Sequence, residues 1–228
     1  RTADAAYVIR QAECSTLITH DTSGPIDYWA MVDEMVPSAE RSADGKINAK
    51  DFPGLARIII KTTDASAAAP FGAANWRDLG RDPDPTLDAE LEARTAAVVP
   101  TDAAFIMYTS GTTGFPKGVV RNHLFLRNQV DRVRILGTTE LDIMYNYLPL
   151  FHIFGYLDGP MLSMATGNKQ ILVETFDPEA CLDAVEAEGV SQFSGFETHM
   201  KSLVEAQKRH ARDLSSLRIG IFGAGTNS

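Results

Sequence analysis

The residues best suited to chemistry stand together at 108–118, where the chain reads Tyr-Thr-Ser-Gly-Thr-Thr-Gly-Phe-Pro-Lys-Gly. Hydroxyl side chains donate hydrogen bonds to phosphate oxygens, glycines let backbone N–H groups approach closely, and a lysine adds a mobile positive charge. Pro116 stiffens the segment just before Lys117 by fixing its own φ. The apolar run at 103–107 predicts a buried strand leading into the segment. We therefore expect a loop that follows a strand and wraps a polyphosphate.

The order of residues in this loop differs from the common P-loop, which needs Gly-x4-Gly-Lys followed by Ser or Thr. Here Pro116 stands five residues after Gly111, and Gly118 follows Lys117. Clusters of Gly, Ser and Thr are also frequent in loops that bind nothing, so an ordinary loop is the alternative.

The ordered string resembles the signature loop of the adenylate-forming superfamily, which includes acyl-CoA synthetases, aryl-CoA ligases, luciferases and the adenylation domains of peptide synthetases. In that family the loop holds the pyrophosphate end of ATP. The resemblance therefore implies a set of nucleotide-binding residues: Thr109, Ser110, Gly111, Thr112, Thr113, Gly114 and Lys117.

A second motif, Leu-Pro-Leu-Phe-His-Ile-Phe-Gly at 148–155, resembles the family's aromatic–histidine pair beside the reacting carboxylate. On the residues alone, the favoured interpretation of His152 is a structural residue bonded to a backbone carbonyl. The resemblance makes His152 a catalytic residue that orients the acid, together with Lys117 at the phosphates. The neighbours Phe151, Ile153 and Phe154 are apolar and include no Asp for a substrate ammonium, so an acid without an α-amino group is favoured.

Two further segments have weaker signals. Gly223, Ala224 and Gly225 follow an apolar strand and resemble the family's backbone ledge beside adenine; as a dinucleotide fingerprint they are incomplete. At 190–199 the chain departs from the family's Val-Pro-Thr-Met, with Glu197 in place of the proline. Phe193 and Phe196 fit an acyl pocket or an ordinary core equally well. Glu197 and His199 lack a third ligand, so we expect no protein metal site.

Alternating hydrophobic patterns predict an α/β fold of βαβ units, with a largely parallel sheet flanked by helices. The resemblance implies the acyl-CoA synthetase-like N-terminal domain. We expect an N-terminal α/β portion at 1–85, closing with a long surface connection at 62–84, and a nucleotide-binding α/β portion at 86–228. The patterns predict helices at 4–13, 25–36, 87–97, 122–136, 154–165, 177–188 and 197–210, and strands at 15–20, 56–61, 103–109, 142–148, 169–173, 190–193 and 217–222.

Bulk composition limits the function classes. The net charge of −9 argues against a general binder of nucleic acid or of anionic membranes. Cys14 and Cys181 have no metal-type spacing and fit a reducing cytoplasm. Because no run of about 18 apolar residues occurs, we expect no integral membrane segment.

The resemblance implies an AMP-forming acid–thiol ligase of fatty acid or related metabolism, with ATP, Mg²⁺ and CoA as cofactors and a small carboxylic acid as substrate. The acid attacks ATP to give acyl-AMP and pyrophosphate, and CoA then displaces AMP. Three alternatives remain open: a nucleotide-binding module without catalysis, an amino-acid adenylation domain, and a hydrolase or NAD-type binder on a similar sheet. The absence of Gly-x-Ser-x-Gly weighs against the hydrolase.

We expect the chain to be an internal piece of a longer enzyme, because it lacks an initiator Met and stops in a glycine turn after a strand. The family's Mg²⁺-binding glutamate, ribose-binding aspartate and bridging lysine would then lie beyond Ser228. Losing one preorganised electrostatic group costs about 10²–10³-fold in rate. Residues 1–228 alone should therefore give no measurable acyl-CoA when assayed with ATP, CoA and acids. Turnover equal to that of a complete family enzyme would contradict this expectation.

Overall fold

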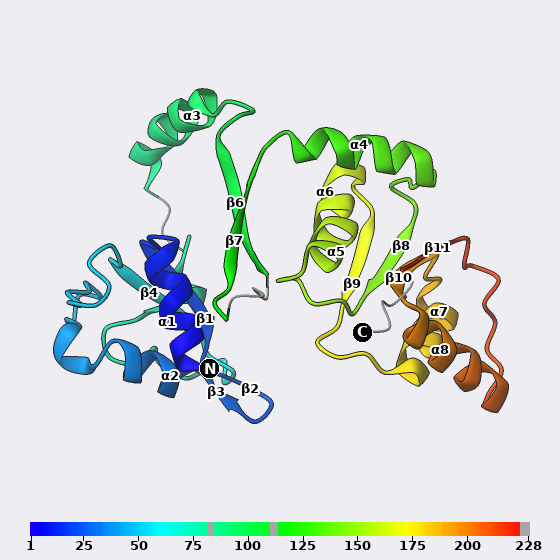
Figure 1. Ribbon diagram of the computed structural model, residues 1–228, viewed down its shortest axis with the longest axis horizontal. Helices are drawn as coiled ribbons and strands as arrows, with labels where there is room; N and C mark the ends of the chain where they lie inside the picture. Colours follow the sequence, from blue (N-terminus) through cyan, green and yellow to red (C-terminus); the bar gives the residue numbers. More distant parts are fainter. Residues whose placement is uncertain (82–83, 110–113, 224–228) are drawn as a thin grey trace. The chain divides into compact units, whose positions relative to one another are not determined.

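The computed structural model describes residues 1–81, 84–109 and 114–223, and the chain divides into two compact units (Figure 1). The first unit comprises residues 1–98, and the second comprises most of residues 99–223, with residues 114–116 grouping with the first. The expected division of the chain near residue 85 stays a prediction, because compact units need not coincide with domains.

The first unit is built on a three-stranded parallel sheet in the order β1-β4-β5. The outer strand β5 lies within the connection expected at 62–84, so that connection is partly structured. It also contains the 3₁₀ turn η2 at Trp76–Asp78. The predicted helix at 25–36 starts later, because Asp27 accepts a hydrogen bond from the Ala30 N–H and caps it. The elements are α1 (Thr2–Gln11), β1 (Thr16–His20), β2 (Thr22–Ser23), β3 (Ile26–Asp27), α2 (Tyr28–Met35), η1 (Ser38–Glu40), β4 (Arg57–Lys61), β5 (Ala74–Asn75), η2 (Trp76–Asp78), η3 (Pro85–Leu87) and α3 (Asp88–Ala97).

The second unit joins an antiparallel hairpin, β6–β7, to a four-stranded parallel sheet in the order β11-β10-β8-β9. Parallel strands linked by helices confirm the α/β fold expected from the sequence. The elements are β6 (Ala103–Thr109), β7 (Lys117–Asn122), α4 (Phe125–Leu136), β8 (Ile143–Asn146), α5 (Ile153–Tyr156), η4 (Leu157–Met161), α6 (Leu162–Thr166), β9 (Lys169–Leu172), α7 (Pro178–Glu188), β10 (Gln192–Phe196), α8 (Glu197–Arg209) and β11 (Ile219–Gly223).

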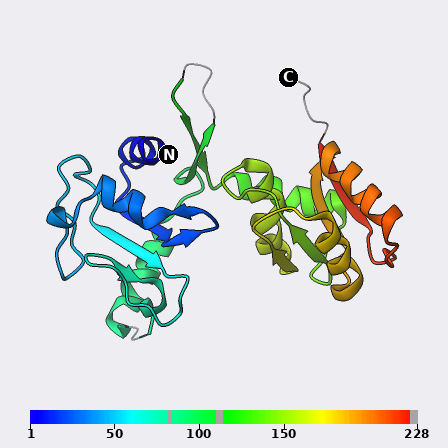
Figure 2. The ribbon, with the colours of Figure 1, turned by 90° about the horizontal axis from the view of Figure 1, so that it is seen from below.

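Helices cover both faces of the four-stranded sheet (Figure 1, Figure 2). Side chains alternate along β8: Tyr145 points into the core formed with α7 and α8, where Leu182 and Leu203 are buried. Met144 faces the other way and contacts Gln170 of β9. The expected start of α7 is confirmed, since Asp177 caps the helix and Pro178 occupies its first position.

Three sequence predictions in this unit were wrong. Residues 117–122 form strand β7 rather than leading into a helix, and α4 begins only at Phe125. Strand β6 is half-exposed rather than buried, with Ile106 40% exposed. The helix expected at 154–165 is broken by the π-helical turn η4, because Gly159 has non-helical dihedrals and Pro160 lacks an N–H group.

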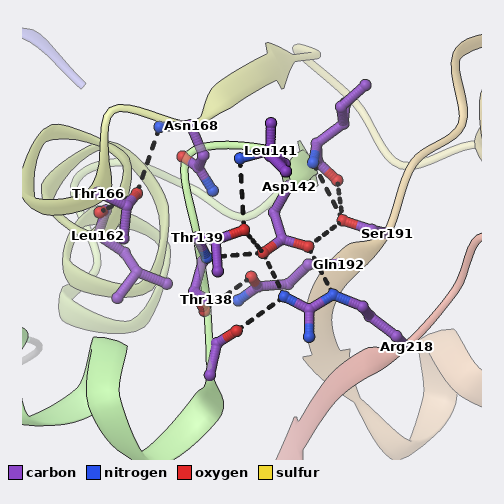
Figure 3. Close-up of polar contacts among 12 residues, drawn as sticks. Thr138, Thr139, Leu141, Asp142, Leu162, Thr166, Asn168, Ser191, Gln192 and Arg218 are labelled. Atoms are coloured by element: carbon purple, nitrogen blue, oxygen red, sulfur yellow. Dashed lines mark hydrogen bonds and ion pairs between the residues drawn. The ribbon is translucent and has the colours of Figure 1, made fainter.

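An ion pair between a buried carboxylate and a half-exposed guanidinium ties the amino ends of three parallel strands together (Figure 3). Asp142, which precedes β8 and is 3% exposed at its side chain, forms a two-pronged ion pair with Arg218, which precedes β11. The Asp142 carboxylate also accepts the Ser191 hydroxyl at 2.6 Å and the Thr139 N–H at 2.7 Å. Burial alone would raise the pKa of Asp142, but these hydrogen bonds and the Arg218 charge together hold it well below its usual range.

The Asp142 network should stabilise the fold at neutral pH and lose this contribution in acid. The folded-state pKa of Asp142 lies below its ordinary value of 3.8, so the stabilisation is present above that value and is lost as the pH falls through the lower folded-state pKa. We expect Asp142→Asn to lower the free energy of unfolding by about 1–3 kcal/mol at pH 7, because Arg218 stays half-exposed and can be solvated.

Urea unfolding followed by circular dichroism measures this effect at pH 7 and again near pH 3. The difference between wild type and variant should shrink in acid. The control is Asp44→Asn, which breaks an exposed pair with Lys46 and should leave the unfolding midpoint unchanged. Equal losses at both pH values would contradict the assigned role of the Asp142 charge.

Candidate active site at the carboxyl edge of the sheet

The tip of the β6–β7 hairpin holds two of the predicted phosphate ligands. Thr109 pairs with Lys117 across the strands, and the Thr109 hydroxyl donates to the Lys117 carbonyl at 3.5 Å. The Lys117 side chain is exposed, while its backbone belongs to a strand rather than to a flexible loop. Gly114 has φ of 93°, a conformation that favours glycine. The remaining predicted loop residues, Ser110, Gly111, Thr112 and Thr113, lie outside the described residues.

Close packing between the hairpin strands explains the glycine of the Lys117–Gly118 pair. A Cβ atom at Gly118 would lie 3.0 Å from Ile106 Cγ2 and 3.2 Å from the Tyr108 ring. The hairpin is joined to the helices of its unit through Phe105, whose ring meets those of Phe125 at 5.0 Å and Tyr156 at 5.2 Å. The hairpin packs on the helices at Phe105, four residues before Thr109 on the same strand. Thr109 and its partner Lys117 therefore lie at the end of the hairpin that is away from these helices.

His152 lies between β8 and α5 and caps the helix that follows it. Its Nδ1 atom accepts a hydrogen bond from the Phe154 N–H at 3.2 Å, and its side chain is exposed. The ring therefore bonds a backbone N–H rather than the backbone carbonyl of the structural alternative. In a neutral imidazole with Nδ1 as the acceptor, the proton sits on Nε2. His152 can thus donate a hydrogen bond from Nε2 to a carboxylate or phosphate oxygen.

A group of aromatic rings surrounds the same edge of the sheet, and we call Tyr147, Phe154, Phe176, Phe196 and His199 the carboxyl-edge cluster. Phe154 and Phe196 meet edge to face at 5.5 Å between ring centroids. The His199 ring contacts Phe176 at 4.6 Å, Tyr147 at 5.0 Å and Phe196 at 5.8 Å. Four of the cluster's residues follow or end strands β8, β9 and β10, whose carboxyl ends share one edge. This is where ligands bind in open parallel sheets.

His199 repeats the arrangement of His152. Its Nδ1 atom accepts the Phe196 N–H at 3.2 Å at the start of α8, and burial lowers its pKa. Sequence reasoning considered His199 only as a metal ligand and did not select Tyr147 or Phe176. The available signal was their position near the carboxyl ends of the strands predicted at 142–148, 169–173 and 190–193.

The Tyr147 hydroxyl fits into the space left by a glycine. Tyr147 is 5% exposed, and a Cβ atom added to Gly195 would overlap its hydroxyl oxygen. Within the described part of the chain this hydroxyl has no hydrogen-bond partner. Burial raises the pKa of Tyr147, which keeps the group protonated. Gly195 is therefore needed for close approach between β10 and the residue that follows β8.

Of the third segment predicted to bind the nucleotide, residues 223–225, the structure describes only Gly223. Gly223 ends β11 and pairs with Phe196 of the carboxyl-edge cluster, so the expected adenine ledge begins at this edge. A Cβ atom at Gly223 would meet the Phe196 ring at 3.6 Å, an ordinary contact. Ala224 and Gly225 lie outside the described residues.

Two features are absent from the described residues. They contain no group of three or more His, Cys, Asp or Glu side chains placed to hold a metal ion. Over the same residues, no helix combines the length and the apolar character that crossing a membrane requires.

Comparison with curated proteins finds relatives among CoA ligases. The chain is 34% identical over 178 residues, 76% of its length, to a methyl-dioxo-octahydroindenyl-propanoyl:CoA ligase of Rhodococcus jostii, and covers 33% of that protein. It is 30% identical over 126 residues, 55% of its length, to the medium-chain fatty-acid–CoA ligase of Escherichia coli, of which it covers 22%. It also aligns over 95% of its length, at 30% identity, with YngI of Bacillus subtilis and covers 39% of that protein. The chain thus spans less than two fifths of each of these relatives.

Solved structures show the same fold. Apo MbtA of Mycobacterium smegmatis superposes with a TM-score of 0.72 at 21% identity, covering 99% of this chain and 36% of MbtA. ATP-bound MatB of Rhodopseudomonas palustris superposes with a TM-score of 0.67 at 20% identity, covering 98% of this chain and 38% of MatB. At this level of identity, the likeness concerns the fold alone.

The sequence profile described as AMP-binding enzyme matches residues 1–227, almost the whole chain. The chain belongs to the AMP-binding enzyme family, as the signature loop and the histidine motif led us to expect.

Proposed function

We propose that the complete protein converts a carboxylic acid to its CoA thioester with ATP. A carboxylate oxygen attacks the α-phosphorus of ATP, the bond to the β-phosphate breaks, and pyrophosphate leaves. The CoA sulfur then attacks the acyl carbon, releases AMP and loses its proton. The observation that carries this proposal is the family match over residues 1–227, supported by relatives that are CoA ligases.

The first step demands neutralisation of phosphate charge, and the hairpin tip has suitable groups for it. Thr109 offers a hydroxyl and Lys117 an exposed ammonium side by side on paired strands. We assign both to the β- and γ-phosphates, together with the loop residues Ser110, Gly111, Thr112, Thr113 and Gly114. Mg²⁺ bound to the ATP would neutralise part of the phosphate charge.

His152 is the residue that we assign to the acid. A neutral imidazole with its proton on Nε2 can hold one carboxylate oxygen by a hydrogen bond while the other oxygen attacks phosphorus. We assign the backbone at Gly223, Ala224 and Gly225 to adenine, and Gly223 pairs with Phe196 at the same edge of the sheet. Two free cysteines, Cys14 and Cys181, are compatible with the reducing conditions of the cytoplasm, where we place the protein.

The aromatic surroundings indicate which acids fit. Phe154 bonds His152 through its backbone N–H and its ring meets that of Phe196, and neither ring supplies a carboxylate to pair with a substrate ammonium. We therefore propose acyl or aryl acids as substrates rather than amino acids. The relatives named above for a bicyclic propanoate and for medium-chain fatty acids belong to this class.

In the complete protein, Lys117→Ala should reduce ATP–pyrophosphate exchange by about one to two decades, because a charge-assisted phosphate contact contributes about 1.5–3 kcal/mol. The fold should be unaffected, since the side chain is exposed at the tip of a hairpin. The control is Lys50→Ala at another exposed lysine, in the first unit, which should exchange like wild type. Exchange by Lys117→Ala at the wild-type rate would remove Lys117 from the site.

A panel of acids in the same exchange assay tests the proposed substrate class. Aliphatic and aromatic acids should support exchange and the twenty proteinogenic amino acids should not, because the Phe154–Phe196 pair offers an ammonium no counter-charge. Exchange with amino acids alone would identify an adenylation domain instead. ATP binding without exchange for any acid would indicate a nucleotide-binding module.

A further inference from the structure

The loop that holds His152 is closed by one buried amide side chain, that of Asn146. Asn146 ends β8 and is 6% exposed. Its Oδ1 atom accepts the Leu148 N–H at 3.0 Å, and its Nδ2 atom donates to the Gly155 carbonyl at 3.1 Å. The two backbone groups stand on either side of His152 in the sequence. One side chain therefore ties together the beginning and the end of the segment at 148–155.

The amide is itself held in place by its surroundings. The backbone carbonyl of Asn146 accepts a hydrogen bond at 3.1 Å from the backbone N–H of Val173, which lies just beyond the end of the neighbouring strand β9. On the helix side, a Cβ atom at Gly159 would overlap Asn146 Nδ2, so the π-helical turn η4 packs directly on the amide. A buried amide left unpaired would cost free energy, which favours the one orientation that satisfies both of its ends.

The helix start that follows His152 approaches the loop as closely as a backbone can. A Cβ atom at Gly155 would lie 2.8 Å from the Leu148 carbonyl oxygen and would overlap that of Pro149. Within the loop, the His152 N–H donates to the Pro149 carbonyl at 3.0 Å, and the His152 carbonyl accepts the Tyr156 N–H at 3.0 Å. The backbone of His152 is thus fixed by groups whose separation the Asn146 amide determines.

We propose that Asn146 is a positioning residue for His152: its amide sets the place from which the Nε2–H of the imidazole meets the substrate. This inference rests on the role of His152 in the proposed function. Asn146 touches neither substrate nor nucleotide in this assignment and acts through the loop. A displacement of about 1 Å at a group that contacts the reacting atoms can cost about 10²-fold in rate.

A double-mutant cycle in the ATP–pyrophosphate exchange assay separates positioning from a general loss of structure. The complete protein is compared with its Asn146→Ala, His152→Ala and doubly substituted forms, using an acid that wild type accepts. Asn146→Ala should lower exchange by about 10–100-fold, with the KM for ATP unchanged. The double variant should exchange no more slowly than His152→Ala, because a positioning effect vanishes once the positioned ring is gone.

The matched control is Gln170→Ala. Gln170 lies on β9, donates to Ser163 Oγ at 3.3 Å and also approaches Gly159, whereas the Leu148 N–H and the Gly155 carbonyl bond the amide of Asn146. The fold-decrease in exchange that Gln170→Ala causes, whatever its size, should multiply with the fold-decrease caused by His152→Ala when the two substitutions are combined. Asn146→Ser keeps a hydrogen-bonding side chain at the same place and serves in the cycle if the alanine variant does not fold.

The outcomes are distinct. Wild-type exchange by Asn146→Ala, or effects of Asn146→Ala and His152→Ala that multiply, would overturn the positioning role while leaving the proposed function in place. Failure of both Asn146 variants to fold would overturn it as well, by assigning the amide to stability alone. No exchange by wild type with any acid, or full exchange by His152→Ala, would instead count against the proposed function and remove the inference with it.

Discussion

The parallel pairing of β8 with β10 is the constraint on which the candidate site depends. The pair is short, with Met144 opposite Gln192 and Tyr145 opposite Phe193. Because the strands run in the same direction, their carboxyl ends deliver the His152 loop and the start of α8 to one edge. At the opposite edge, the Asp142–Arg218 pair and the Ser191 hydroxyl keep the strands in register. A slip of one residue would turn Tyr145 out of the core and displace the loop.

The carboxyl edge of the sheet also requires neighbouring segments to approach one another closely. Three glycines with negative φ angles allow this approach. Gly155 lies against the carbonyls of the preceding loop, Gly159 against the Asn146 amide, and Gly195 against the Tyr147 hydroxyl. A side chain at any of the three would push apart the elements that carry the aromatic and histidine rings. Gly155 and Gly195 use the absence of Cβ, and Gly159 adds to this the non-helical dihedrals of the turn η4.

Local signals predicted part of this structure, whereas strand β7 and the carboxyl-edge cluster depend on contacts between separate segments. The Asp177–Pro178 start of α7 is encoded within two residues, and hydrophobic alternation predicted the parallel strands. Residues 117–122 form a strand only because β6 is available to pair with them, which no local pattern reveals. Likewise, Tyr147, Phe176 and His199 are far apart in the sequence and meet only once β8, β9 and β10 are aligned. The signature loop and His152 were recognised because their motifs are contiguous.

The use of Nδ1 by both histidines has a consequence for the proposed chemistry. His152 and His199 each accept a backbone N–H at the start of the helix that follows their strand, which leaves the proton of the neutral ring on Nε2. Burial lowers the pKa of His199 and further favours its neutral form. A neutral imidazole donates a hydrogen bond without giving up its proton. An acid held in this way stays a carboxylate, and its free oxygen keeps the charge with which it attacks the α-phosphorus.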